Sequence, residues 1–177
     1  MRRPSRAILT FAAVAAFAVS GTATATATTE TAAQATSMAA HFGTVPASST
    51  ASAIGDIYPA KWRNVPQDSV VDDWNMYNRE CVSWAAFNIA RHGESANNYG
   101  DAKYWDDNAR NNGYRVDNNP TEGSIAQTDN GTYGHVAIVD SVHGGTVTVE
   151  DYNWAGDGHY LVHDVSASSF RYIHFYN

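Results

Sequence analysis

Two stretches between residues 80 and 113 have the hydrophobic spacing of helices. The first is apolar on almost every side from Glu80 to Arg91 and is followed by Gly93, so it predicts a buried helix. The second runs from Asp101, which can cap a helix, to Gly113. Its apolar positions share one face, at Ala102, Trp105 and Ala109.

Beyond Gly123 the pattern alternates between apolar and polar residues, as it does in β-strands. Five strands are predicted, at residues 124–127, 135–142, 146–151, 160–165 and 171–175. Hairpin-type connections are expected at 129–131 and 143–145, and a turn at 118–120. Because helices come first and a strand meander follows, we expect an α+β domain with N-terminal helices packed on an antiparallel β-sheet.

The first 52 residues differ in composition from the rest. An apolar stretch from Ala7 to Val19 follows three arginines and precedes Ala-Thr-Ala repeats, which predicts a secretory signal peptide over residues 1–27. Residues 28–52 are mostly Ala, Thr and Ser and predict a disordered linker, since few large apolar side chains offset the entropy of ordering. Residues 53–177 then form one domain, entered through an extended segment at 53–73.

The charge balance is acidic. The chain has 11 Lys and Arg against 18 Asp and Glu, a formal net charge of -7, and loss of the three signal-peptide arginines would make it -10. Such a surface argues against nucleic acid as a partner and against attraction to anionic membranes. We therefore expect a secreted monomer with no stable membrane association after signal cleavage.

Cys81 is the only cysteine of the chain. An exported protein with one thiol cannot form an intramolecular disulfide, so the sulfur is either an inert buried atom or a reactive nucleophile. The polar residues before Cys81 give way to an apolar run, which places the thiol at the start of the first helix. The positive end of a helix stabilises a thiolate.

A cysteine hydrolase also needs an imidazole and a group that orients it. His135 opens a strand directly after Gly134, and alternation places it on one face with Ala137 and Val139, which we expect to lie against the helix that bears Cys81.

On the next strand, alternation from Val147 and Val149 puts Asp151 and Asn153 on the buried face and Glu150 outside. Pattern alone therefore nominates Asp151 as the orienting acid. A bulge in this strand would nominate Glu150 instead.

Three ordered segments carry a family resemblance: residues 78–84 (Asn-Arg-Glu-Cys-Val-Ser-Trp), 133–137 (Tyr-Gly-His-Val-Ala) and 150–154 (Glu-Asp-Tyr-Asn-Trp). From about Tyr58 to the C terminus the chain resembles CHAP domains, the cysteine- and histidine-dependent amidohydrolases/peptidases. The resemblance implies a papain-like fold and cleavage of peptidoglycan amide bonds at the cell wall, without metal or other cofactor. It implies that Cys81 is the nucleophile and His135 the base and acid, with Asp151 and Asn153 orienting the imidazole.

Two positions depart from the family pattern. Glutamate is the more usual acid where Asp151 stands, and many relatives have Gln where this chain has Glu80. The backbone N–H of Cys81 is therefore the expected oxyanion donor. Trp154, next to Asn153, is a candidate for the wall of a substrate cleft, whereas His159 and His163 do not form a metal-ligand pattern.

The sequence leaves other functions open. A cell-wall binding module on the same fold would keep the aromatic residues but have an unreactive thiol, and a secreted effector would use the same residues on a different amide. The choice between an N-acetylmuramoyl-L-alanine amidase and an endopeptidase also stays open.

Overall fold

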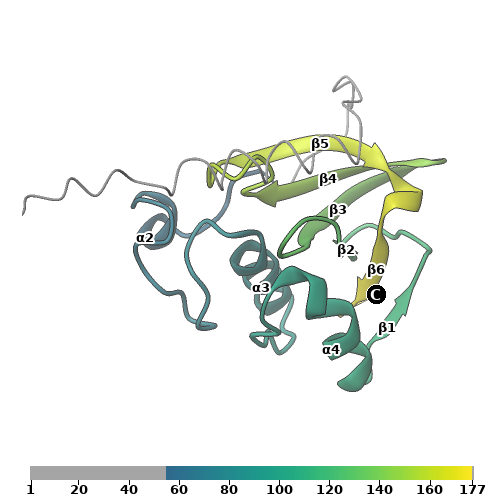
Figure 1. Cartoon of the computed structure of the whole chain (residues 1–177), viewed down its shortest axis with the longest axis horizontal. Coiled ribbons are helices and arrows are strands. Elements are labelled where there is room, and N and C mark those ends of the chain that lie inside the picture. Colours follow the sequence, from purple (N-terminus) through teal and green to yellow (C-terminus); the bar gives the residue numbers. More distant parts are fainter. Residues whose placement is uncertain (1–54, 177) are drawn as a thin grey trace, which may run out of the picture.

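The computed structural model describes residues 55–176. The predicted signal peptide, residues 1–27, and the predicted linker, residues 28–52, lie outside the described residues. Helices gather on one side of a curved six-stranded antiparallel sheet, so the α+β fold is confirmed (Figure 1). No helix within residues 55–176 has the length and apolar character needed to cross a bilayer.

Helix α3, Cys81–Arg91, is the central helix and agrees with its prediction to within one residue. It ends where predicted, since the Gly93 N–H donates to the Ala90 carbonyl at 3.0 Å and Gly93 has φ +85°. The lead-in is not wholly extended, because it contains a short helix, α2, at Ala60–Arg63.

Buried polar side chains tie the lead-in to the start of α3. The Ser83 hydroxyl lies between the Tyr58 hydroxyl, at 2.5 Å, and the Asp72 carboxylate, to which it donates. Asp72 also accepts from the backbone N–H groups of Trp74 and Met76, both at 2.9 Å. These bonds fix residues 72–76 against the helix, because a buried polar group left without a partner would cost stability.

The second predicted helix is divided into a 3₁₀ turn, η1 at Ala102–Tyr104, and α4 at Trp105–Asn111. The Lys103 N–H, in the first turn where no intrahelical acceptor is available, donates to the Tyr133 carbonyl at 2.9 Å and so ties η1 to the segment before β3. A short strand that the pattern did not predict, β1 at Arg115–Asp117, follows α4. It has a single apolar residue, Val116, too few positions to reveal alternation.

The five predicted strands are all present, each with bounds within one residue of its prediction. They are β2 at Ile125–Thr128, β3 at His135–His143, β4 at Thr146–Tyr152, β5 at Tyr160–Ser166 and β6 at Arg171–His174. A 3₁₀ turn, η2 at Ala167–Ser169, separates the last two. The strand order is β1-β6-β2-β3-β4-β5, so the meander holds only from β2 to β5, and β6 returns to pair with β2.

The two faces of the sheet bury different side chains. Val136 and Ile138 pack in one cluster with Trp84 and Ile89 of α3. Ala137 and Val139 pack in a second cluster, whose other members are Ala126, Val147, Val149, Val165, Phe170 and Tyr172. The expectation that Ala137 and Val139 lie against the helix was therefore wrong, because the larger Val136 and Ile138 fill that space.

Candidate active site

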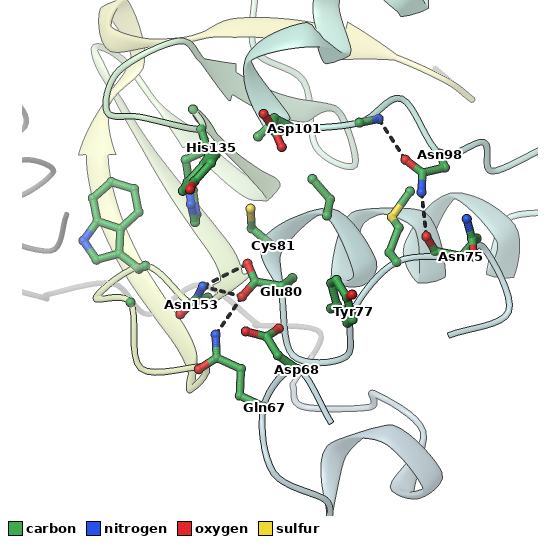
Figure 2. A pocket seen from close by; sticks show the side chains of 18 residues that line it. Gln67, Asp68, Asn75, Tyr77, Glu80, Cys81, Asn98, Asp101, His135 and Asn153 are labelled. Carbon is green, nitrogen blue, oxygen red and sulfur yellow. Dashed lines mark hydrogen bonds between the residues drawn. The ribbon is translucent and has the colours of Figure 1, made fainter. Parts of the chain in front are cut away.

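A cleft of about 640 Å³ opens at the N-terminal end of α3. Loops that are distant in the sequence form its walls: the segment before α3, the segment before η1, the residues before β3 and the loop after β4. Cys81, His135, Asn153 and Trp154 all line it, and Figure 2 shows Cys81 and His135 close to each other while Asn153 points to Glu80. The expectation that Trp154 lies at a cleft is confirmed.

The local backbone places the Cys81 thiol at the bottom of this cleft. Arg79 has φ +62°, a left-handed conformation that turns the chain into the helix, and its Nε donates to the Gly158 carbonyl at 2.8 Å. Glu80 is the N-cap residue, so Cys81 is the first residue of α3. The thiol is largely buried, with 8% of the residue exposed, and lies at the positive end of the helix.

His135 is the first residue of β3 and lies beside Cys81 (Figure 2). Gly134 before it has φ +74°, and a Cβ there would meet the Lys103 nitrogen at 2.5 Å and the Thr128 carbonyl oxygen at 2.6 Å. Only glycine allows the backbone to come this close, so the sequence-based expectation of a close approach at Gly134 is met by another backbone segment.

The His135 imidazole interacts with groups on both sides. Its Nε2 lies 3.0 Å from Asp151 Oδ2, and its other nitrogen, Nδ1, is left for the Cys81 thiol. Burial lowers the pKa of His135, but the negative charges of Cys81 and Asp151 and hydrogen bonds to both outweigh it and raise the pKa to about 10. An imidazolium therefore persists through neutral pH.

Asp151 is fully buried and remains ionised. Burial raises the pKa of its carboxyl, yet the charge and hydrogen bond of His135, together with a hydrogen bond from His163, bring the pKa below its ordinary value. The nomination of Asp151 from strand alternation thus agrees with the geometry. The one bulge of the β3–β4 pair lies between Val139 and Ser141, and it leaves the parity of β4 unchanged.

Glu150 faces the helical side of the sheet and is not exposed, so the expectation that it points outward was wrong. Its carboxylate accepts from the Tyr160 hydroxyl at 2.7 Å, and its backbone carbonyl accepts from Trp84 Nε1 at 3.2 Å. The outward assignment failed because the face that Glu150 shares with Ile138 is the one packed against α3.

Asn153 lines the cleft, but its backbone does not continue the regular strand that was expected. It has φ +65°, which ends the strand and interrupts the alternation, so its side chain does not lie beside Asp151 on the same face. Its Nδ2 donates to both Glu80 carboxylate oxygens, at 2.8 and 2.9 Å, and its Oδ1 accepts from the Gly158 N–H at 2.8 Å. No hydrogen bond within residues 55–176 joins the Asn153 side chain to His135, and the Asn153 amide instead contacts Glu80, the residue that precedes Cys81.

Glu80 and Asp68 form a pair of carboxyl groups in the cleft wall (Figure 2). Burial raises the pKa of Glu80, donation from Asn153 and from Gln67 at 2.7 Å lowers it, and the charge of Asp68 raises it. Burial also raises the pKa of Asp68, which is hydrogen-bonded to Glu80. Two hydrogen-bonded carboxyl groups favour a shared proton, because both charges together would repel.

Sequence reasoning missed Asp68, Gln67 and His163 as parts of this site. Asp68 and Gln67 lie in an irregular segment, where no periodicity indicates direction. The sequence did indicate the direction of His163, because this residue is two positions from both Leu161 and Val165 and so shares their face of β5. That face pairs with the face of β4 that holds Asp151. Within residues 55–176, no group of three or more His, Cys, Asp or Glu side chains is arranged to hold a metal ion.

Comparisons with known proteins place part of the chain in a family. Residues 71–153 match the model of the CHAP domain family. A probable autolysin, SsaALP, of Staphylococcus aureus is 42% identical over 83 residues, which cover 45% of this chain and 31% of that protein. An N-acetylmuramoyl-L-alanine amidase, sle1, of Staphylococcus haemolyticus is 36% identical over 107 residues, covering 56% of this chain and 32% of that protein.

A solved structure shares the fold. The crystal structure of an N-acetylmuramoyl-L-alanine amidase from Staphylococcus aureus superposes with a TM-score of 0.52 and 22% identity, covering 60% of this chain and 33% of that one. The chain thus spans about a third of the length of the relatives it matches. The matched segment contains Cys81, His135, Asp151 and Asn153. This chain therefore contains a CHAP domain, at residues 71–153.

Proposed function

We propose that this chain is a secreted cysteine amidohydrolase that cleaves amide bonds in the stem peptides or cross-bridges of peptidoglycan. One observation carries the proposal: at the head of α3, a single buried imidazole lies between the thiol of Cys81 and the carboxylate of Asp151. Such an arrangement keeps a thiolate and an imidazolium together at neutral pH, which is the resting state that a cysteine hydrolase needs.

In the first half of the reaction, the Cys81 thiolate attacks the amide carbonyl carbon and forms a tetrahedral intermediate. The backbone N–H of Cys81 is at the start of α3, where N–H groups lack an intrahelical acceptor, and it donates to the developing oxyanion. The imidazolium of His135 then passes its Nδ1 proton to the departing amine. The C–N bond breaks and leaves a thioester on Cys81.

In the second half, water replaces the amine in the cleft. Neutral His135 takes a proton from this water, which attacks the thioester carbonyl and releases the carboxylic acid and the thiolate. His135 is again an imidazolium at the end of the cycle. Asp151 accepts from Nε2 throughout, which holds the ring so that Nδ1 faces the reacting atoms.

The substrate class comes from the relatives. An autolysin and N-acetylmuramoyl-L-alanine amidases are the proteins whose matched segments resemble this chain at 36–42% identity. The wall is also a substrate that an exported protein would meet. The walls of the cleft are polar and aromatic, and they include Asn75, Asn98, Tyr77 and Tyr133. Such walls suit a peptide with amide and carboxylate groups.

The test is digestion of purified peptidoglycan by the wild-type protein and by Cys81→Ser, followed by mass spectrometry of the released fragments. We expect fragments only with the wild type. Free stem peptides would identify an amidase, whereas cut peptides still attached to sugar would identify an endopeptidase. Release of equal fragments by both proteins would refute the cysteine mechanism, and no release by either, with hydrolysis of soluble peptides by the wild type, would refute the wall substrate.

A further inference from the structure

His163, on strand β5, contacts the carboxylate that holds the active-site imidazole. Its Nε2 lies 3.0 Å from Asp151 Oδ2, the same oxygen that lies 3.0 Å from His135 Nε2. The side chains of His135, Asp151 and His163 are 4%, 0% and 14% exposed. Asp151 thus accepts hydrogen bonds from two imidazoles in a site that is almost closed to water.

Strand register explains how the three side chains meet. Val149 of β4 pairs with Val139 of β3 on one side and with His163 of β5 on the other. Paired residues share a face of the sheet, as do residues two apart on a strand, so His135, Asp151 and His163 all project from the same face. Asp151 is on the central strand of the three and receives one donor from each neighbour.

The second donor matters because the carboxylate has little else to hold it. Asp151 Oδ1 is buried and has no hydrogen-bond partner within the described residues. A carboxylate held by His135 alone would be free to rotate about its terminal torsion, which is broad, and it would be a buried charge with one bond. The hydrogen bond from His163 restricts that rotation and offsets part of the burial penalty, which is one cause of the lowered pKa of Asp151.

Trp154 holds the second imidazole in place. Its ring centroid lies 4.4 Å from that of His163 and 5.0 Å from that of His135, edge-on to the latter. Both imidazoles therefore contact one aromatic side chain that also lines the cleft. The packing restrains the two rings that donate to Asp151.

We propose that His163 is a positioning residue of this active site, which orients the Asp151 carboxylate so that it can hold the His135 imidazolium. The proposal rests on the proposed function, in which Cys81 and His135 carry the chemistry. It also accounts for the use of aspartate at a position where glutamate is more usual, since the shorter side chain is held from a second strand.

Two substitutions separate donation from packing. His163→Gln keeps a nitrogen donor at the same number of bonds from Cα, whereas His163→Met keeps the length and loses the donor. We expect His163→Met to lower kcat about 10- to 100-fold with little change in KM, as a small misplacement of a catalytic group does. His163→Gln should stay within about threefold of the wild type, because the hydrogen bond is retained.

The pH profile separates positioning from a purely structural role. Without the donor, the pKa of Asp151 rises, so the acidic limb of kcat/KM should move to higher pH in His163→Met and stay in place in His163→Gln. His159→Met is the matched control, because the His159 side chain is 72% exposed and, among residues 55–176, its ring pairs only with Asp157, at 3.0 Å. It should leave both activity and the limb unchanged.

Alkylation by iodoacetamide keeps this test independent of the substrate. Cys81 is the only thiol, so the rate of alkylation against pH reports its ionisation alone. The acidic fall in this rate should move upward in His163→Met even if peptidoglycan is not the substrate. Wild-type profiles of both rate and alkylation in His163→Met would overturn the proposal, as would equal loss in the Met and Gln variants.

Discussion

Replacement of Asp151 by asparagine removes the charge that holds the active-site imidazolium while changing the side-chain shape very little. The pKa of His135 is about 10, against an ordinary value of 6.5, which corresponds to roughly 5 kcal/mol in favour of the imidazolium. The charges of Cys81 and Asp151 supply this preference together. If Asp151 supplies about half, its loss costs roughly 2–3 kcal/mol, or about 30- to 150-fold.

The asparagine amide adds a second effect. If its Nδ2 faces His135, it donates to Nε2 and selects the tautomer that carries a proton on Nδ1, and that nitrogen then cannot accept the proton of the Cys81 thiol. With both effects, we expect kcat of Asp151→Asn to fall about 10²- to 10⁴-fold. KM should change much less, because Asp151 is fully buried and does not face the cleft.

Glu150→Gln is the matched control, since it makes the same chemical change one residue earlier. The glutamine oxygen can still accept from the Tyr160 hydroxyl, so turnover should stay within about threefold of the wild type. Both variants would be assayed for fragment release from peptidoglycan after thermal unfolding shows that each is folded. Turnover in Asp151→Asn above a tenth of the wild type, or a larger loss in Glu150→Gln, would refute the reasoning.

Three further predictions follow from the site. His135→Ala should abolish hydrolysis and make Cys81 alkylation slow below pH 8, as an ordinary thiol is; fast alkylation at pH 6 would contradict this. The raised pKa of Glu80 means that the folded state favours its protonated form, so the wild type should lose stability as pH rises above about 4.5. Glu80→Gln removes this titration, and Tm measured from pH 4 to 8 should therefore fall less in the variant. Gly134→Ala should lower the stability by about 1–3 kcal/mol, since its Cβ would meet three backbone atoms, of Lys103 and Thr128, at φ +74°; an unchanged Tm and full activity would contradict this.

Local patterns in the sequence determined the main elements and nominated Cys81, His135 and Asp151 for the site. The all-round apolar run of α3 and the alternation of five strands are set by burial within each element, so they could be identified without tertiary information. The same alternation selected Asp151 over Glu150, because a regular strand from Val147 keeps a period of two. Cys81 could be assigned to a helix start because the change from polar to apolar residues is local.

Tertiary structure decided which face of each strand meets the helix and which partners each site residue has. Ala137 and Val139 lie away from α3, since the volume of Val136 and Ile138 is what fits against Trp84. This choice depends on the packing of two elements, and neither element's periodicity contains it.

The hydrogen-bond partners of Asn153 and Asp151 also depend on the tertiary structure. Its left-handed backbone turns the side chain to Glu80, and the donors for Asp151 come from strands on both sides. His163 is 12 residues from Asp151 along the chain and touches it only through the register of β4 and β5. Periodicity fixes the direction of a side chain within its own strand, but a hydrogen bond between strands also needs their alignment, which only the folded sheet supplies.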